Sequence, residues 1–250
     1  MSYPLPLQSV ALIGRQDSPE AADSIAALAD FFRAQGVSVL VETETAIQAE
    51  QLIGKSALAG GECADFQQIG SHADLAVVVG GDGTMLHAAR QLARFDRPLV
   101  GINQGRLGFM TDIARSDMIE AMGLLLAGKF TQEERLLLDT EVVFGGASAG
   151  WKPQANLAFN DVVIDKGAIG RLIEFELRVD DEFIFSARAD GLIICTPTGS
   201  TAYALSADGP ILHPSLAGLL IVPVAPHALT NRPIALPQHS TIDIHVTGGK

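Results

Sequence analysis

An uninterrupted apolar run, Leu-Ala-Val-Val-Val at residues 75–79, leads directly into Gly-Gly-Asp-Gly-Thr at residues 80–84. A run without polar alternation is typical of a strand that is buried on both faces of a parallel sheet. Such a sheet needs helices on both sides to cover it, and a helical pattern does resume at Thr84. This feature therefore favours an α/β architecture.

The rest of the first half repeats the alternation of strand and helix. Ser18-Pro19-Glu20 has the N-cap, the first-turn proline and the acidic residue of a helix start, and Gly36 is placed to end that helix. Apolar spacing indicates further elements, which are strands at 9–13, 37–41 and 98–102 and a helix at 117–126. We therefore predict a parallel-sheet α/β domain over residues 1–134, carrying the glycine-rich turn.

Beyond about residue 130 the pattern changes to strands with few helical stretches between them. Asp180-Asp181 separates two strand-like runs and indicates a tight hairpin. Alternating or apolar runs predict strands at 136–144, 172–179, 183–187, 192–195, 219–224 and 242–246. We therefore predict a β-rich second domain over residues 135–250.

The charge balance limits the class of partner. Seventeen Lys and Arg against 29 Asp and Glu give a net charge of −12, so neither nucleic acid nor an anionic membrane fits, because phosphate groups in both require a basic footprint. Two cysteines, Cys63 and Cys195, are typical of a reducing compartment. The first residues lack the basic and apolar regions of a signal peptide, and no apolar run is long enough to span a membrane. We expect a soluble, cytoplasmic protein.

The Gly-Gly-Asp-Gly-Thr turn is the sharpest candidate site. Gly80, Gly81 and Gly83 let the backbone approach a ligand closely, and the helix that resumes at Thr84 offers N–H groups to an anion, so these residues are predicted to bind phosphate. Asp82 supplies a carboxylate that can bind a metal or accept a proton. The alternative is a plain strand-to-helix turn in which Asp82 caps the helix.

A second candidate site surrounds the predicted strand at 192–195. Asp190-Gly191 precedes that strand, and Thr196–Ser206 follows it with hydroxyl groups that can bind phosphate or ribose. Tyr203 can present its ring to a base. The alternative is a capped turn with a tyrosine in the core.

Two further segments carry candidate residues. Asn160-Asp161 lies between two apolar triplets, where polar groups are costly unless the protein or a ligand satisfies them. The alternative there is a bulge or an edge position. The loop 103–109 follows a predicted strand, and its Phe109 can line a pocket or belong to the core.

Several common motifs are missing from the sequence. The Gly-x-Gly-x-x-Gly pattern of dinucleotide-binding domains does not follow the first strand, where only Gly14 is found, and no P-loop or nucleophile elbow occurs. The six histidines show no metal-ligand spacing with the two cysteines. These absences disfavour an ordinary dehydrogenase, a P-loop enzyme, a serine hydrolase and a structural zinc site.

Taken together, the segments resemble the bacterial NAD kinase family, whose members phosphorylate the adenosine ribose 2′-hydroxyl of NAD to make NADP. The GGDGT turn alone is shared with diacylglycerol kinases and phosphofructokinases, whereas TPTGSTAYALS at 196–206 separates the families. NQGRLGFMTD at 103–112 and Asn160-Asp161 follow the family's order and spacing, and the resemblance extends from Ser9 to Val246. It implies a Rossmann-like parallel-sheet N-terminal domain, an all-β sandwich-like C-terminal domain, and an active site between them.

The same resemblance implies the reactants. ATP is the phosphoryl donor, NAD is the acceptor, and a divalent metal, Mg²⁺ in most members, is the cofactor; the sequence identifies no protein ligand for it. Family members form homodimers or homotetramers. Two alternatives stay open, a lipid or sugar kinase of the same superfamily and a non-catalytic NAD(P) sensor.

The resemblance also assigns site residues by position in the motifs. Asp82 matches the general base and, with Gly83, contacts NAD. Further NAD-binding positions are matched by Phe109, Asn160, Asp161, Arg171, Arg188, Asp190, Thr201, Ala202, Tyr203, Ala204, Leu205, Ser206 and Ala225. A purely structural interpretation of Arg188 is an ion pair with Asp180 or Asp181 across the hairpin.

The sequence departs from the family pattern in two places. Asp161 stands where most members have glutamate, which is one methylene longer. The sequence ends at Lys250, whereas most members continue through further strands, so we expect the last part of the family's C-terminal pattern to be missing.

Overall fold

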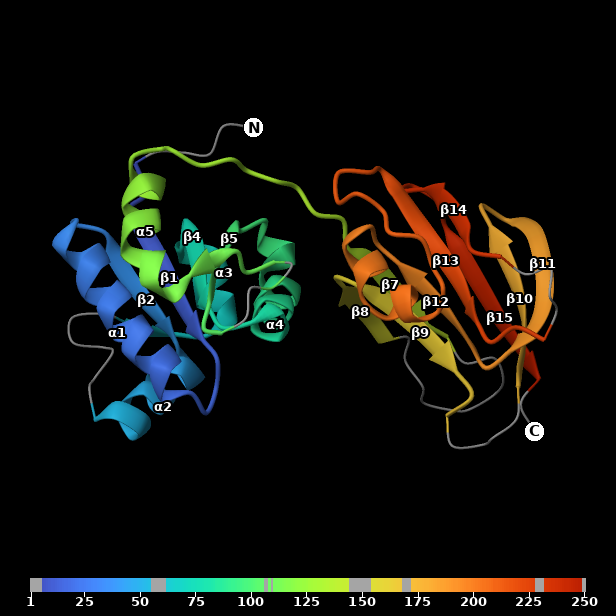
Figure 1. Ribbon diagram of the computed structural model, residues 1–250, viewed down its shortest axis with the longest axis horizontal. Helices are drawn as coiled ribbons and strands as arrows, with labels where there is room; N and C mark the ends of the chain where they lie inside the picture. The colour runs from blue at the N-terminus through green and yellow to red at the C-terminus, as the bar shows by residue number, and fades with distance from the viewer. Residues whose placement is uncertain are drawn as a thin grey trace. The chain divides into compact units, whose positions relative to one another are not determined.

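The computed structural model describes residues 6–54, 62–105, 108, 110–143, 154–167, 172–227 and 232–248. Internal contacts divide the chain into two compact units, Met1–Thr131 and Gln132–Lys250, which we call unit 1 and unit 2. In Figure 1 unit 1 runs from blue to yellow-green and unit 2 continues to red. None of the described helices is long and apolar enough to cross a membrane.

Unit 1 is built on a six-stranded parallel sheet with the order β3-β2-β1-β4-β5-β6. Its strands are β1 Ser9–Gly14, β2 Ser38–Glu42, β3 Glu62–Ala64, β4 Leu75–Val79, β5 Leu99–Asn103 and β6 Ile113–Ala114. Its helices are α1 Pro19–Ala34, α2 Thr43–Ile53, α3 Phe66–His72, α4 Asp82–Leu92 and α5 Met118–Leu126, with short 3-10 turns at η1 Ala93–Phe95 and η2 Arg115–Asp117. The predicted α/β fold with a parallel sheet is confirmed.

Both faces of this sheet are covered, as the apolar run at 75–79 predicts. In β4, Leu75, Val77 and Val79 belong to one core with α1, α2 and α5, whereas Ala76 and Val78 belong to a second core with α3 and α4 (Figure 1). All five residues are buried. The strand has no solvent-facing side, which is why its sequence shows no polar alternation.

Local sequence patterns predicted some helices of unit 1 but not others. Ser18 is the N-cap of α1, where its Oγ accepts a hydrogen bond from Ala21 N at 3.3 Å, as predicted. Helices α2 and α3 are not predicted by the sequence analysis. Helix α2 buries only Thr45, Ala46 and Ala49, so its apolar periodicity is weak, and α3 has only seven residues.

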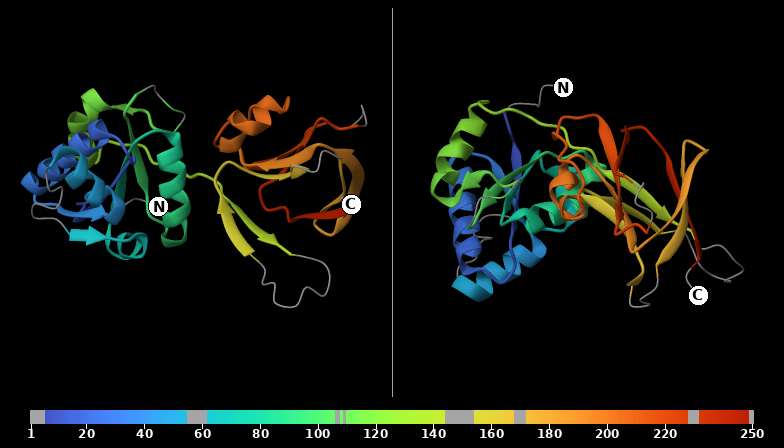
Figure 2. Two further views of the ribbon diagram at one scale, coloured as in Figure 1. Left: turned by 90° about the horizontal axis from the view of Figure 1, so that it is seen from below. Right: turned by 45° about the vertical axis from the view of Figure 1, so that its right-hand side comes forward.

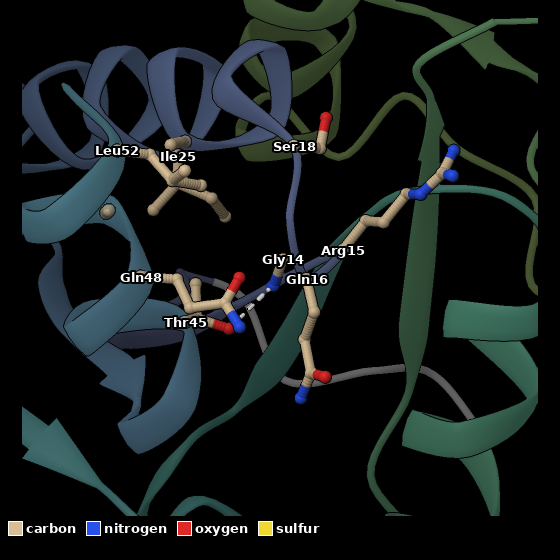
Figure 3. Close-up of a pocket in the computed structure, with 10 residues that line it drawn as sticks. Gly14, Arg15, Gln16, Ser18, Ile25, Thr45, Gln48 and Leu52 are labelled. Atoms are coloured by element: carbon tan, nitrogen blue, oxygen red, sulfur yellow. Dashed lines mark hydrogen bonds between the residues drawn. The ribbon is translucent and has the colours of Figure 1, made fainter.

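The strand order reverses beside β1, whose neighbours are β2 and β4. In open parallel sheets, ligands bind at such a point, outside the carboxyl ends of the strands. The ends of β1 and β4 are adjacent, because Arg15 N donates to Val79 O at 2.8 Å. Beside Gly14, whose N–H donates to Thr45 Oγ1 at 2.9 Å, lies a cavity of about 10 Å³ (Figure 3). That volume holds about one water molecule, so the β4 end is the better place for a larger ligand.

Unit 2 contains two antiparallel sheets that share a core. The four-stranded sheet has the order β14-β13-β12-β9, the three-stranded sheet has the order β11-β10-β15, and β7 pairs with β8. The strands are β7 Leu138–Val142, β8 Gln154–Ala158, β9 Asp161–Asp165, β10 Ile173–Val179, β11 Glu182–Ala189, β12 Gly191–Cys195, β13 Gly218–Val224, β14 Ile234–Pro237 and β15 Ile242–Gly248, with short helices η4 Thr198–Thr201 and α6 Tyr203–Ser206.

The shared core makes unit 2 a sandwich. Phe175 and Leu177 from β10 pack with Leu192 and Ile194 from β12 between the two sheets. The strands of unit 2, coloured from yellow-green to red, can be followed in Figure 2. The hairpin between β10 and β11 turns at Asp180-Asp181, with positive φ angles of 51° and 66°. The predicted sandwich-like C-terminal domain and its hairpin are therefore confirmed.

Candidate functional site

Asp82 opens helix α4 directly after the buried strand β4. The N-cap position of this helix belongs to Gly81, so the alternative in which Asp82 caps the helix is wrong. The Asp82 carboxylate is instead held by a different loop. Its Oδ1 accepts hydrogen bonds from Met110 N at 3.1 Å and from Thr111 Oγ1 at 3.4 Å.

The glycines of this turn differ in whether a side chain would fit at their positions. A Cβ on Gly80 would lie 2.5 Å from Thr84 Oγ1, so only glycine lets the start of α4 pack against the strand end. A Cβ on Gly81 or Gly83 would meet nothing within 4 Å. Gly83 is exposed in the first turn of α4, where the helix dipole and the N–H groups favour an anion. The turn has the properties that a phosphate site requires.

Described residues between β5 and β6 lie against the Asp82 carboxylate. A Cβ on Gly108 would lie 2.2 Å from Asp82 Oδ1, so a larger residue at that position would displace the carboxylate. Thr111 is fully buried and accepts a hydrogen bond from Asn103 Nδ2 at 2.9 Å. Phe109, which we expected to line a pocket here, lies outside the described residues.

In unit 2, the segment Thr196–Ser206 follows β12 as predicted, but it uses hydroxyl groups to build its own turn. The bonds run from Thr196 Oγ1 to Phe159 O at 2.7 Å, from Ser200 Oγ to Pro197 O at 2.6 Å, and from Thr201 Oγ1 to Thr198 O at 3.1 Å. These hydroxyl hydrogens are committed to backbone carbonyls. That the same hydroxyls bind phosphate or ribose stays a prediction.

Tyr203, by contrast, begins α6 with 46% of its surface exposed. The alternative that places this tyrosine in the core is therefore wrong. The next residue, Ala204, is buried against β12 and β13 and fixes α6 to the sheet. An exposed aromatic ring on an anchored helix is suited to stacking against a base.

The polar pair Asn160-Asp161 marks the break between β8 and β9, two strands of different sheets. The carbonyl of Asn160 accepts a hydrogen bond from Thr196 N at 2.9 Å. A Cβ on Gly199 would lie 1.9 Å from the same carbonyl oxygen, so glycine is required where the turn meets the break. The structure thus brings together two segments that the sequence analysis selected separately.

Asp161 pairs with Cys195 across β9 and β12. Burial raises the pKa of the Asp161 carboxyl, and a hydrogen bond from the backbone N–H of Tyr203 acts in the opposite direction. Burial, reinforced by the Asp161 charge, raises the pKa of the Cys195 thiol to about 12. Cys195 therefore stays protonated at neutral pH and is not a nucleophile.

A second group of predicted residues lies at the opposite end of β12. Asp190 precedes this strand and forms an ion pair with Lys166, with Oδ1 and Nζ 2.7 Å apart. Ala225 follows Val224, which pairs with Gly191 at the start of β12, and has a positive φ of 44°. The sequence analysis did not predict Lys166, because nothing in the pattern links it to a partner 24 residues away.

Arg188 lies on β11 and forms an ion pair with Glu174, its cross-strand neighbour on β10. The alternative pairing with Asp180 or Asp181 is therefore wrong. Both side chains line an open groove of about 440 Å³ on the three-stranded sheet. Arg171, expected to contact NAD, lies outside the described residues.

Comparison with known proteins accounts for most of the chain. The family model described as ATP-NAD kinase N-terminal domain matches residues 10–130, and the model described as ATP-NAD kinase C-terminal domain matches residues 159–250. The chain belongs to the NAD kinase family. The NAD kinase of Aromatoleum aromaticum is 52% identical over 235 residues, covering 94% of this chain and 75% of that protein. The NAD kinase of Burkholderia pseudomallei is 49% identical over 242 residues, covering 97% and 77%.

Solved structures of NAD kinase relatives share the fold. A yeast NADH kinase complexed with NADH has a TM-score of 0.86 at 26% identity and covers 96% of this chain and 72% of its own. An NAD kinase from Archaeoglobus fulgidus in complex with ATP has a TM-score of 0.65 at 23% identity, covering 94% and 80%, and supports the fold alone. The family resemblance drawn from the sequence is confirmed.

The sequence analysis missed the contacts that hold Asp82 in this NAD kinase. Met110 and Thr111 belong to the segment 103–112, which we used only to mark the family. One signal was available, Gly101 in the middle of β5. A Cβ there would lie 2.7 Å from Thr111 Cγ2, and a glycine inside a strand pattern indicates such a close approach.

Proposed function

We propose that this NAD kinase transfers the γ-phosphoryl group of ATP to the 2′-hydroxyl of the adenosine ribose of NAD. The observation that carries the proposal is Asp82, a carboxylate held at the start of α4 within a glycine turn. A ribose hydroxyl is a weak nucleophile until a base takes its proton. Asp82 combines such a base with neighbouring backbone suited to phosphate.

The reaction needs only proton transfer, positioning and charge stabilisation from the protein. Asp82 accepts the hydroxyl proton while the ribose oxygen bonds to the γ-phosphorus and the bond from that phosphorus to its bridging oxygen breaks, releasing ADP. The exposed backbone at Gly83 and the dipole of α4 stabilise phosphate charge. In unit 2, the exposed ring of Tyr203 and the half-buried carboxyl of Asp161 bind the adenosine portion of NAD.

The donor set fits a magnesium ion that arrives with the triphosphate. Within the described ranges, no group of three or more His, Cys, Asp or Glu side chains could hold a metal ion. Mg²⁺ is commonly bound by one or two carboxylates together with substrate phosphates, and Asp82 supplies one such carboxylate. When bound, the ion would supply much of the positive charge that neutralises the phosphates in a chain whose net charge is −12.

The test is a coupled assay on the purified chain. NAD, ATP and Mg²⁺ are supplied, and NADP is read by an NADP-specific dehydrogenase. We expect NADP to form and its formation to stop when ATP or Mg²⁺ is omitted. NAD binding without NADP formation would instead favour the NAD(P) sensor, and phosphorylation of a diacylglycerol or a sugar in place of NAD would favour the other kinases.

We further propose that the enzyme is cytoplasmic and forms a homodimer or homotetramer. Cys63 and Cys195 are both free thiols, which fits a reducing compartment. The edge strand β11 exposes Phe183 and Ile184, and an apolar strand edge favours association. Light scattering coupled to size-exclusion chromatography tests the assembly, and a monomer throughout the micromolar range would contradict it.

A further inference from the structure

We propose that Thr111, oriented by Asn103, is a positioning residue for the Asp82 carboxylate. The inference rests on the proposed function, because it concerns the base of that reaction. Neither Thr111 nor Asn103 is among the candidate site residues that the sequence analysis selected. Their placement, burial and hydrogen-bond direction carry the argument.

The amide of Asn103 has one defined orientation. This residue ends β5 and is only 5% exposed. Its Oδ1 accepts a hydrogen bond from Gly105 N at 2.6 Å, and a backbone N–H can only donate. Nδ2 therefore faces Thr111, where it lies 2.9 Å from Oγ1 and 3.4 Å from the carbonyl oxygen.

The orientation of Asn103 fixes the direction of the Thr111 hydroxyl. A threonine hydroxyl has one hydrogen to donate and two lone pairs to accept with. Since Nδ2 of Asn103 can only donate, it occupies a lone pair of Thr111 Oγ1 and leaves the hydroxyl hydrogen for another acceptor. Asp82 Oδ1 is 3.4 Å away and accepts it. Thr111 is fully buried, so water does not compete for this hydrogen.

The same carboxylate oxygen is confined on two further sides. Met110 N donates to Asp82 Oδ1 at 3.1 Å, which adds a second donor from the same loop. A Cβ on Gly108 would lie 2.2 Å from that oxygen and 2.8 Å from Thr111 Oγ1. Among the described residues, two hydrogen-bond donors and one glycine thus lie against Oδ1, and the carboxylate has little room to rotate.

A general base works only when its oxygen lies within hydrogen-bond reach of the proton that it takes. The two hydrogen bonds, from Asn103 to Thr111 and from Thr111 to Asp82, hold the Asp82 carboxylate in one rotation before the substrate arrives. Loss of the Thr111 hydroxyl should therefore reduce turnover while substrate binding changes little. A misplacement of about 1 Å can cost up to about 100-fold in rate.

The experiment compares Thr111→Val with Thr111→Ser, since valine keeps the shape and serine keeps the hydroxyl. We expect kcat of Thr111→Val to fall about 10–100-fold with both KM values within about threefold of wild type, and Thr111→Ser to recover most of the rate. The control is Ser9→Ala, which removes a hydroxyl with two hydrogen bonds, to His72 O and from Asp74 N, at the amino end of β1. This control should lower thermal stability and leave kcat unchanged.

The decisive measurement repeats Thr111→Val in the Asp82→Asn background. A residue that acts through the base should add less than about a twofold further loss once the base is gone. Equal losses in both backgrounds, or wild-type kcat in the single variant, would overturn the positioning role. If Thr111→Val does not fold, Gly108→Ala tests the same contact, and unchanged turnover in that variant would also overturn it. A folded wild-type protein that forms no NADP refutes the proposed function itself.

Discussion

The two candidate turns have the same outline but use their polar groups differently. Each joins the end of a fully buried strand to a helix, β4 to α4 in unit 1 and β12 to η4 and α6 in unit 2. In unit 1, the polar group Asp82 is held by a separate loop through Met110 and Thr111. In unit 2, Thr196 and Ser200 bond to the backbone of their own turn and of the neighbouring strand break.

The difference separates two roles that look alike in the sequence. An ionised carboxylate only accepts hydrogen bonds, whereas a hydroxyl both donates and accepts and can close a turn by itself. We therefore interpret the hydroxyl-rich turn as a scaffold that carries Tyr203, and the acid-bearing turn as the one that holds the proposed general base. We expect substitutions in the unit 1 turn to change turnover, and those in the unit 2 turn to change stability or affinity.

The largest effect is expected for Asp82→Asn. Asparagine keeps the volume of the side chain and an oxygen that accepts from Met110 N, but it cannot accept the ribose proton. We expect kcat to fall by about 10²–10⁴-fold, the usual contribution of a positioned general base, with NAD binding within about tenfold of wild type. Steady-state kinetics and calorimetric titration with NAD measure the two quantities.

The same variant also separates a base from a metal ligand. If Asp82 acted chiefly by holding magnesium, raising the magnesium concentration would restore much of the lost rate. Recovery of that kind, or a kcat near that of wild type, would contradict the general-base role. Circular dichroism and the thermal midpoint serve as the control for folding.

The scaffold role predicts a different result for Ser200→Ala. Ser200 is fully buried, and its Oγ donates to Pro197 O and accepts from Leu212 N at 2.9 Å, so alanine leaves the part-buried N–H of Leu212 without this partner. We expect a loss of about 1–3 kcal/mol in the free energy of unfolding of unit 2 with kcat little changed. Urea unfolding measures this change in the free energy of unfolding. The exposed Ser215→Ala is the control, with an expected change within about 0.5 kcal/mol.

A smaller effect, on affinity alone, is expected at Tyr203. Because its ring is exposed, Tyr203→Leu should leave stability unchanged and raise KM for NAD by about tenfold, the loss of one modest base stack. Tyr203→Phe keeps the ring and should behave as wild type. Equal KM values for Tyr203→Leu and wild type would show that the ring does not contact the substrate.

The parts of the fold that follow from local physics could be predicted from the sequence. The uniform apolar run of β4 indicates a strand between two helical layers, and Ser18-Pro19-Glu20 places the start of α1. Helix α2 could not be predicted in this way. Its N-terminus is capped by the carboxylate of Glu42, a residue that usually continues rather than starts a helix, and its buried face is made of small residues.

The residues of the candidate site likewise differ in whether the sequence could predict them. Asp82 and Asp161 stand out because they are polar residues next to apolar runs. Hydrogen-bond and ion-pair partners could not be found in this way: Thr111 lies 29 residues from Asp82 in sequence, and Lys166 lies 24 residues from its own partner, Asp190. The hydroxyls of Thr196 and Ser200 look like ligand donors in the sequence, and only the backbone geometry shows that they are used internally.

The smallest expected effect tests whether Asp161, on β9 beside the scaffold turn, lowers the stability of unit 2 at neutral pH. Burial raises the pKa of Asp161, so the folded state binds its proton more tightly than the unfolded state. The resulting stability is present in acid, below the ordinary aspartate value of 3.8, and is lost as the pH rises through the folded-state pKa. At neutral pH the carboxylate is thus an unfavourable buried charge.

Asp161→Asn keeps an acceptor for Tyr203 N without that charge, and it should stabilise unit 2 at pH 7 by no more than about 1 kcal/mol, because water screens a half-buried site. Thermal unfolding from pH 7 to pH 4 should show the stability difference between the variant and wild type narrowing as the pH falls. The KM of the variant for NAD should be higher than that of wild type, because the proposed function assigns the carboxylate to adenosine binding. A variant that is less stable at pH 7, or a difference independent of pH, would show that Asp161 belongs to the scaffold alone.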